Sequence, residues 1–301
     1  EDFTKNFDDV VPSASIGYKL TDMSNLRLGY NMRIYRPGIW YLNPYLNDTD
    51  PSYISQGNSE LDSEKSHAFN LSYSNFTQKF NINLSARYSF TNNSIENVTK
   101  LMPDTEIEGL KNPTGKDVLY STYANIGKTR RASVSAYVNW NATPRTRIYM
   151  NMSGDYSYME GSEGMRNDGW SLFAYGGAQQ TLPHDWRISL NVFGQTPWIM
   201  LQGKGSSFFD YGLSVNKSFL NKRLTLSAFA SNFFKKYMDQ SSTTEGAGFI
   251  RESSYKYSRQ RFGISVSYRI GELKASVKKA ARTISNDDVK SGGSGSGGGG
   301  E

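Results

Sequence analysis

Side chains able to do chemistry are sparse in this sequence of 301 residues. It has no Cys, and its two His, His67 and His184, stand far apart without ligand-spaced partners. A zinc site or a catalytic centre needs several such groups to converge, so we interpret both His as surface or interfacial residues. No Ser stands in a nucleophile elbow, and no Gly-rich phosphate loop occurs. The sequence therefore predicts a protein that is not an enzyme and uses no metal or cofactor.

Acidic residues gather between the expected strands. Glu60, Asp62 and Glu64 form one group, and Glu106 with Glu108 forms a second. Acid–base catalysis needs a positioned pocket, so solvated loop charge is the favoured interpretation. The segment Asn47–Asp50 offers oxygens to calcium, but the rest of an EF-hand loop is missing.

Aromatic residues in two long connections are the candidate ligand-binding residues. Trp40, Tyr41, Tyr45 and Tyr53 lie in the first connection, and Trp198 lies in a later one. Exposed rings can stack on sugars or hold a peptide. Packing of the rings within their own loops is the alternative, and it stays open at this point.

The elements that must position these residues are strands. In Phe262–Gly271 every second residue is apolar, and the residues between them are Gly, Ser or Arg. This period of two predicts a β-strand with one apolar and one polar face. The pattern predicts about eleven strands and no helix. The expected strands are Ser13–Leu20, Leu26–Ile34, His67–Phe76, Lys79–Phe90, Val118–Trp140, Arg145–Tyr158, Gly169–Thr181, Asp185–Gln195, Ser206–Phe219, Arg223–Tyr237 and Ser254–Ile270.

Connections between these strands alternate in length. The short ones are Thr21–Asn25, Asn75–Gln78, Ala142–Arg145, Leu182–Asp185 and Leu220–Arg223, and the long ones are Arg36–Lys65, Thr99–Asp117, Met159–Asp168, Thr196–Gly205 and Asp239–Ser253. A membrane barrel sorts its loops in this way, with tight turns inside and long loops outside. The alternation requires Val118–Trp140 to be one strand with a bulge near Asn125–Gly127.

The composition fits this interpretation. The mean hydropathy is −0.60, and no apolar run approaches the length of a membrane-spanning helix, but barrel strands average out as polar. The net charge is +6, and the Lys and Arg residues are scattered along the chain. This distribution argues against nucleic acid as a partner. Aromatic residues recur near the strand ends, as expected at headgroup level. We therefore expect the apolar face to meet outer-membrane lipid and the polar face to line a lumen.

The chain also resembles the C-terminal part of the β-barrel of TonB-dependent receptors. The resemblance covers nearly the whole chain and runs through the segments Arg33–Asp50, Gly57–Ser74, Tyr123–Trp140 and Gly263–Asp288. It implies an all-β antiparallel transmembrane meander, the C-terminal half of a barrel of about 22 strands. It also implies a plug domain, absent from this chain, that engages the TonB system. An odd number of strands does not close an antiparallel ring, which agrees with half a barrel.

The resemblance implies an outer-membrane receptor and transporter for a nutrient ligand that the sequence does not identify. Two alternatives stay open, a non-transport barrel such as an adhesin or scaffold, and a soluble all-β binding protein. We expect residues 1–271 to form strands and loops, and residues 272–301 to form an extension ending in a disordered Gly/Ser-rich tail.

Overall fold

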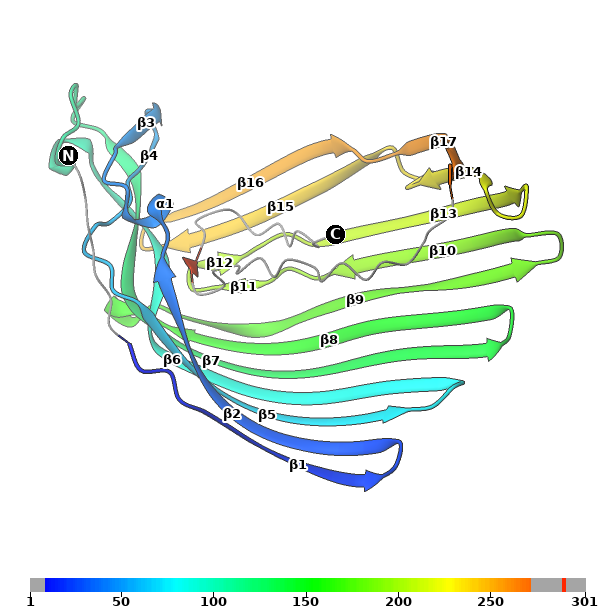
Figure 1. Cartoon of the computed structure of the whole chain (residues 1–301). Helices are drawn as coiled ribbons and strands as arrows, with labels where there is room; N and C mark the ends of the chain where they lie inside the picture. The colour runs from blue at the N-terminus through cyan, green and yellow to red at the C-terminus, as the bar shows by residue number, and fades with distance from the viewer. Residues whose placement is uncertain (1–8, 272–288, 291–301) are drawn as a thin grey trace.

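The computed structural model describes residues 9–271 and 289–290. In this part the chain is mostly strand, and most of the strands lie side by side in a curved main sheet (Figure 1). The helical segments in it are single turns, namely α1 (Ile39–Leu42), η1 (Asp104–Glu106) and η2 (Ser162–Gly164). Across the described ranges, no helix has the length and apolar character needed to cross a membrane.

An antiparallel meander of eleven strands forms the main sheet of the described residues. The strands in order are β1 (Ser13–Thr21), β2 (Ser24–Pro37), β5 (Glu64–Phe76), β6 (Phe80–Pro103), β7 (Asp117–Thr143), β8 (Thr146–Glu160), β9 (Arg166–Leu182), β10 (Trp186–Gln195), β13 (Phe208–Phe219), β14 (Leu224–Ser231) and β17 (Arg261–Tyr268). Each strand pairs with the strand before it, which confirms the expected all-β meander. Within the described residues, β1 and β17 each have one edge without a partner strand.

The strand β7 is continuous, as the alternation of loop lengths requires. Its register against β6 skips a residue, since Gly127 faces Ser94 and Asn125 faces Ile95. The predicted bulge near Asn125–Gly127 is therefore confirmed. A Cβ atom on Gly127 would lie 2.0 Å from the Ser94 hydroxyl oxygen, so a larger residue here would require the Ser94 side chain to move.

The two ends of the sheet differ, as expected from the loop lengths. The turns between β1 and β2, β5 and β6, β7 and β8, β9 and β10, and β13 and β14 are short and lie at one end (Figure 1). The connections between β2 and β5, β6 and β7, β8 and β9, and β10 and β13 lie at the opposite end, and the segment between β8 and β9 is the shortest of these (Figure 1). The segment 232–260 between β14 and β17 begins within the sheet and reaches the opposite end as a hairpin (Figure 1). This opposite end is called the long-loop end below.

Further strands also form within the long connections. They are β3 (Asn47–Asp50), β4 (Tyr53–Ser55), β11 (Ile199–Met200), β12 (Gly203–Lys204), β15 (Tyr237–Gly246) and β16 (Phe249–Ser258). The last four form a separate sheet in the order β11-β12-β15-β16.

Some sequence-based boundaries were wrong near the end of the chain. The expected strand Arg223–Tyr237 ends at Ser231, and Asp239–Ser253 is mostly a β-hairpin rather than an irregular loop. Asn232 causes the break, because its positive φ of 51° turns the chain out of the sheet. Its side-chain amide donates to the Arg259 carbonyl at 3.3 Å, and the expected strand Ser254–Ile270 is interrupted beside that residue. The expectation of no helix was wrong only for the single turns.

Register separates the two faces of the sheet. Ile264 pairs with Ala228, and Ala228 with Val215, so these side chains share one face. Ser265 pairs with Ser227 on the other face. Ile264 is 83% exposed. No side chain in the described part of the chain covers this apolar group, which agrees with the expectation that the apolar face meets lipid.

Aromatic residues form two belts on the apolar face. Phe80 pairs with Trp140 near the short turns, and Phe90 lies in the row of Tyr158 near the long loops. Phe80 and Phe90 stand ten positions apart on β6, which is about 34 Å along a strand. At a tilt of roughly 40° this spans about 26 Å of bilayer, close to the apolar band of such barrels.

The extension predicted for residues 272–301 lies outside the described residues, apart from β18 (Val289–Lys290). The backbone of β18 pairs in parallel with Arg36 and Pro37 of β2.

Candidate functional site

A folded platform at the long-loop end carries the candidate site. Strands β6 and β7 continue past their bulge, and the segment between β2 and β5 packs on them. Tyr41 meets Tyr123 edge to face with ring centroids 4.5 Å apart, and Leu61 and Ile95 complete this core. The Glu64 carboxylate accepts the Ile95 N–H at 2.5 Å. The loop is thus held by packing and by a charge-assisted hydrogen bond.

The β3–β4 hairpin is joined to the same platform. β4 pairs in parallel with β7, and Ile54 is buried against Ile107 and Val118. The main sheet therefore continues from the barrel wall into the loop region.

The loop after β6 is closed by a carboxylate. Asp104 accepts hydrogen bonds from the Thr114 N–H at 2.6 Å, the Thr114 hydroxyl at 2.8 Å and the Gly115 N–H at 2.8 Å. The Thr114 backbone bond, with the others, holds the pKa of Asp104 below its ordinary value.

A third core joins the loop after β10 to the platform. Ile199 and Leu201 pack on Met159. The Gln202 side chain accepts from the Thr99 N–H at 2.8 Å and donates to the Thr99 carbonyl at 2.9 Å. Connections far apart in sequence are therefore one packed unit.

The structure assigns the five candidate residues to different environments. Tyr41 is 8% exposed and belongs to the core. Burial raises the pKa of its hydroxyl to about 12. Tyr41 thus follows the alternative of packing within the loop.

Tyr53 and Trp198 are half-buried and have partners within the chain. The Arg251 guanidinium carbon lies 3.8 Å from the Tyr53 ring centroid, which ties β4 to β16 through a cation–π contact. A Cβ atom on Gly205 would lie 2.0 Å from the Trp198 ring, so this indole covers the bare backbone of Gly205.

Trp40 and Tyr45 remain on the surface. They are 69% and 75% exposed, and Ile39 beside them is 76% exposed. The Asn43 side-chain oxygen accepts the Tyr45 N–H at 3.1 Å, so the backbone carrying these rings is ordered by a local turn. Of the five candidates, these two rings are available to a ligand.

Sequence reasoning missed a cavity of about 510 Å³ beside the middle of β9, the end of β10 and the start of β13. Leu172 and Phe209 from the apolar face line it together with Lys235, Asp239 and Tyr257. The lining comes from several separate segments, so no local pattern marks it.

The acidic residues and the two His do not come together into a metal site in the described residues. Across residues 9–271 and 289–290, no group of three or more His, Cys, Asp or Glu side chains could hold a metal ion. Tyr30 shares a hydrogen bond of 2.8 Å with the His67 ring, which stacks on Phe90 at 4.8 Å. His184 lies in a short turn with a φ of 61°.

The inner face of the wall carries a polar network. Ser133 donates to Asp155, the Ser85 and Ser135 hydroxyls lie 2.6 Å apart, and Tyr149 donates to Asn191. Such a surface is wetted rather than apolar, as in a barrel with an aqueous interior.

Comparison with solved structures places this architecture among outer-membrane receptors. The siderophore receptor PirA from Pseudomonas aeruginosa is similar over 75% of this chain, with a TM-score of 0.55 and 17% identity. The copper transporter OprC covers 85% with a TM-score of 0.57 and 14% identity. A variant of the ferric enterobactin receptor PfeA from Pseudomonas aeruginosa covers 86% with a TM-score of 0.54 and 16% identity. At these identities the likeness shows the fold.

The chain spans about two fifths of these receptors, since it covers 39%, 40% and 40% of them. They are transport receptors rather than enzymes. No curated protein sequence matches the chain.

A family model described as "Outer membrane protein beta-barrel family" matches residues 1–268. This match sets aside the soluble binding protein as an alternative. The chain belongs to the outer membrane protein beta-barrel family, and its strands share the fold of part of the barrel of these outer-membrane receptors.

Proposed function

We propose that this chain forms part of the wall of a TonB-dependent receptor that takes up a nutrient ligand. One observation carries the proposal, namely a continuous sheet whose outer face is apolar with two aromatic belts and whose inner face is mostly polar, apart from a cluster of rings at Phe173, Phe193 and Phe208. A wall of this kind separates lipid from an aqueous passage. A plug domain outside this chain would gate the passage and engage TonB.

In this proposal the long-loop end faces the cell exterior and captures the ligand. Trp40 and Tyr45 contact it, because their rings are exposed on an ordered loop. Tyr41, Tyr53 and Trp198 hold the platform beneath them. An exposed aromatic pair fits flat or ring-bearing ligands. The siderophore and copper named for the similar receptors define the first probes.

The test is uptake in cells that express the full-length receptor, with and without TonB. The probes are radiolabelled ferric enterobactin and copper, then labelled glycans, peptides and vitamins. The variant is Trp40→Ala with Tyr45→Ala. The control is Tyr255→Ala, which removes a ring that is 68% exposed on β16.

We expect TonB-dependent uptake of one probe, lowered by the double variant and unchanged by the control. Equal surface levels of all variants exclude a folding defect. Binding at the surface without uptake would identify an adhesin or scaffold instead. Uptake that persists without TonB would contradict the energised mechanism.

A further inference from the structure

A cluster of charged residues lies on the apolar face, in the belt row at the long-loop end and in the next row beyond it. Arg130 pairs with Tyr158 and lies in its row. In the next row toward the loops, Lys128 pairs with Glu160 and Glu160 with Arg166. These four charged residues, Lys128, Arg130, Glu160 and Arg166, are called the rim cluster.

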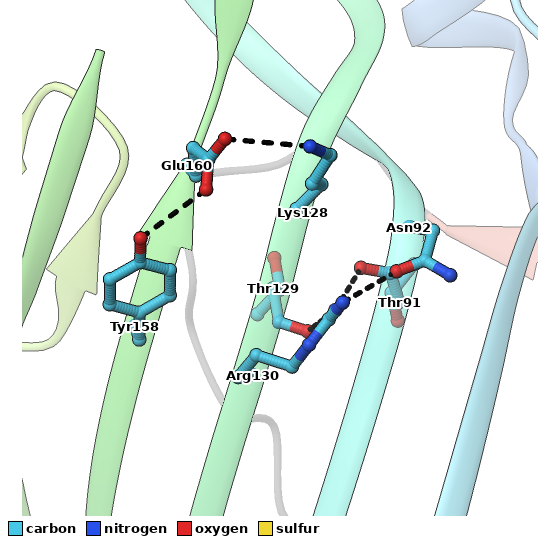
Figure 2. A network of polar contacts seen from close by, with 7 residues as sticks. All are labelled: Thr91, Asn92, Lys128, Thr129, Arg130, Tyr158 and Glu160. Carbon is cyan, nitrogen blue, oxygen red and sulfur yellow. Dashed lines mark hydrogen bonds and ion pairs between the residues drawn. The ribbon is translucent and has the colours of Figure 1, made fainter. Parts of the chain in front are cut away.

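Arg130 is held in a fixed position within the rim cluster (Figure 2). One guanidinium nitrogen donates to the Thr91 carbonyl at 3.1 Å and to the Thr129 carbonyl at 3.0 Å. The other terminal nitrogen donates to the Asn92 side-chain oxygen at 2.8 Å. The guanidinium carbon lies 5.4 Å from the Phe90 ring centroid. All these partners are uncharged, so they orient the cation without neutralising it.

The other members leave the rim cluster with an excess of positive charge. Lys128 lies 3.4 Å from a Glu160 oxygen. The other Glu160 oxygen accepts from the Tyr158 hydroxyl at 3.3 Å (Figure 2). Arg166 lies over the Tyr158 ring, with its guanidinium carbon 4.9 Å from the centroid. Throughout the described part of the chain, neither Arg130 nor Arg166 has a carboxylate within ion-pair distance.

One further carboxylate stands beside the rim cluster. Asp168 lies in the row of Arg130 and Tyr158. It accepts from the Tyr156 hydroxyl at 2.7 Å. With Asp168 counted, three cations still face two carboxylates, and both carboxylates already hold tyrosine hydroxyls.

The rim cluster is continuous with the lipid-facing surface. Trp170 pairs with Tyr156 immediately below it and is 67% exposed. Val134, deeper on the same face, is also 67% exposed. One amphiphile can therefore lay its acyl chains on this surface while its headgroup reaches the arginines. A soluble anion would make only the second contact.

We propose that the rim cluster binds the phosphate of an anionic lipid in the leaflet on the long-loop side. Arg130 and Arg166 supply the charged donors, since guanidinium groups match phosphate oxygens in geometry. The ion pair of Lys128 and Glu160 borders the site on the side of the long loops. Basic side chains at headgroup level attract anionic lipids in this way. The inference needs only that the chain lies in a membrane, so it does not depend on nutrient uptake.

The experiment uses the full-length receptor in nanodiscs and reads lipid retention by native mass spectrometry. The probe is dioleoyl phosphatidic acid mixed with dioleoyl phosphatidylcholine. The variant is Arg130→Gln with Arg166→Gln. The matched control is Arg131→Gln, the next residue along β7, which lies on the inner face and donates to the Ser157 hydroxyl oxygen at 3.2 Å.

We expect the wild-type receptor and the control to retain phosphatidic acid over phosphatidylcholine. Retention should fall by about tenfold in the double variant, because two charge-assisted contacts are lost. Equal losses in the variant and the control, or no loss in either, would overturn the proposal. Displacement of the lipid by inorganic phosphate would assign the cluster to a soluble anion instead.

A second variant keeps the test valid if the double Gln variant fails to fold. The charge-preserving pair Arg130→Lys with Arg166→Lys should retain more phosphatidic acid than phosphatidylcholine, at a lower level than wild type. A wild-type receptor that shows no preference between the two lipids would overturn the proposal without any variant.

Discussion

The membrane wall and the long-loop platform differ in the exposure of their apolar side chains. On the wall, Ile264 is 83% and Val134 67% exposed, whereas on the platform Leu61 is 1% and Ile54 2% exposed. One continuous sheet runs through both regions, so secondary structure does not explain the difference. The wall relies on lipid to cover its apolar surface, while the platform relies on its own side chains. Each region should therefore respond to its own class of substitution.

Aromatic residues show the same contrast. Trp140 on the wall is 46% exposed at the level of a belt, where its ring can meet headgroups. Tyr41 on the platform is buried against Tyr123. The role of an aromatic residue in this chain, exposed in a belt or buried in a core, thus depends on whether it lies on the wall or on the platform.

The largest effect is expected from a cavity in the platform. Leu61→Ala should destabilise the loop region by about 2–5 kcal/mol, because no lipid can fill the space left behind. Hydrogen exchange should speed up in the segment between β2 and β5 and leave the wall protected. The control is Leu28→Ala, a lipid-facing change at a site 53% exposed. Equal effects of the two changes would mean that the regions are not distinct.

A charge on the apolar wall is expected to rank next. Ile264→Arg should cost about 2–4 kcal/mol near the bilayer midplane and less near an interface. Ser265→Arg, one residue further on the inner face, should cost little. Unfolding titrations in lipid vesicles measure both.

Cysteine labelling gives the same contrast without a charge. A thiol reagent from water should reach Ser265→Cys, and a lipid-confined quencher should reach the label on Ile264→Cys. The assignment of faces fails if these two accessibilities are reversed.

A smaller effect is expected at the carboxylate that closes the loop after β6. Asp104→Asn should speed hydrogen exchange in residues 104–116, because an amide accepts the Thr114 and Gly115 N–H bonds less strongly. Since the native pKa of Asp104 is lowered, its contribution is fully present above the unfolded pKa. It is lost as the pH falls through the native pKa. Protection of this segment, measured relative to intrinsic exchange at each pH, should therefore fall at acidic pH in the wild type and change less in the variant.

The smallest effect on stability is expected at the exposed rings. Trp40→Ala and Tyr45→Ala should change the free energy of unfolding by less than about 0.5 kcal/mol. Tyr41→Ala, at the residue next to Trp40, removes a core residue and should act like Leu61→Ala. Thermal unfolding of the three variants compares them directly. A large loss of stability with Trp40→Ala would show that this ring packs against the protein and is not free to contact a ligand.

Much of the wall could be read from local pattern. Alternation predicted the strands, and the bulge in β7 followed from the requirement that loop lengths alternate. Both are short-range properties, because neighbouring side chains point to opposite faces whatever the rest of the chain does. The errors fell at Asn232, where a positive φ and a hydrogen bond to the Arg259 carbonyl end the strand. No period marks that break.

The candidate site was harder to read, because five aromatic residues of similar sequence context have different roles. Tyr41 meets Tyr123 of strand β7, and Tyr53 meets Arg251 from the last hairpin. The cavity beside Lys235 and the rim cluster are likewise assembled from separate strands.

The amino-acid order alone set the period of two, the two faces and the positions of the turns, since these depend on chain geometry and side-chain polarity over a few residues. Folding in three dimensions decided which rings are buried, which cations share a rim and how the long connections join. These outcomes depend on contacts between residues such as Thr99 and Gln202, which are 103 positions apart. The local sequence pattern does not predict such a partner, because the contact forms only once the strands between the two residues are in register.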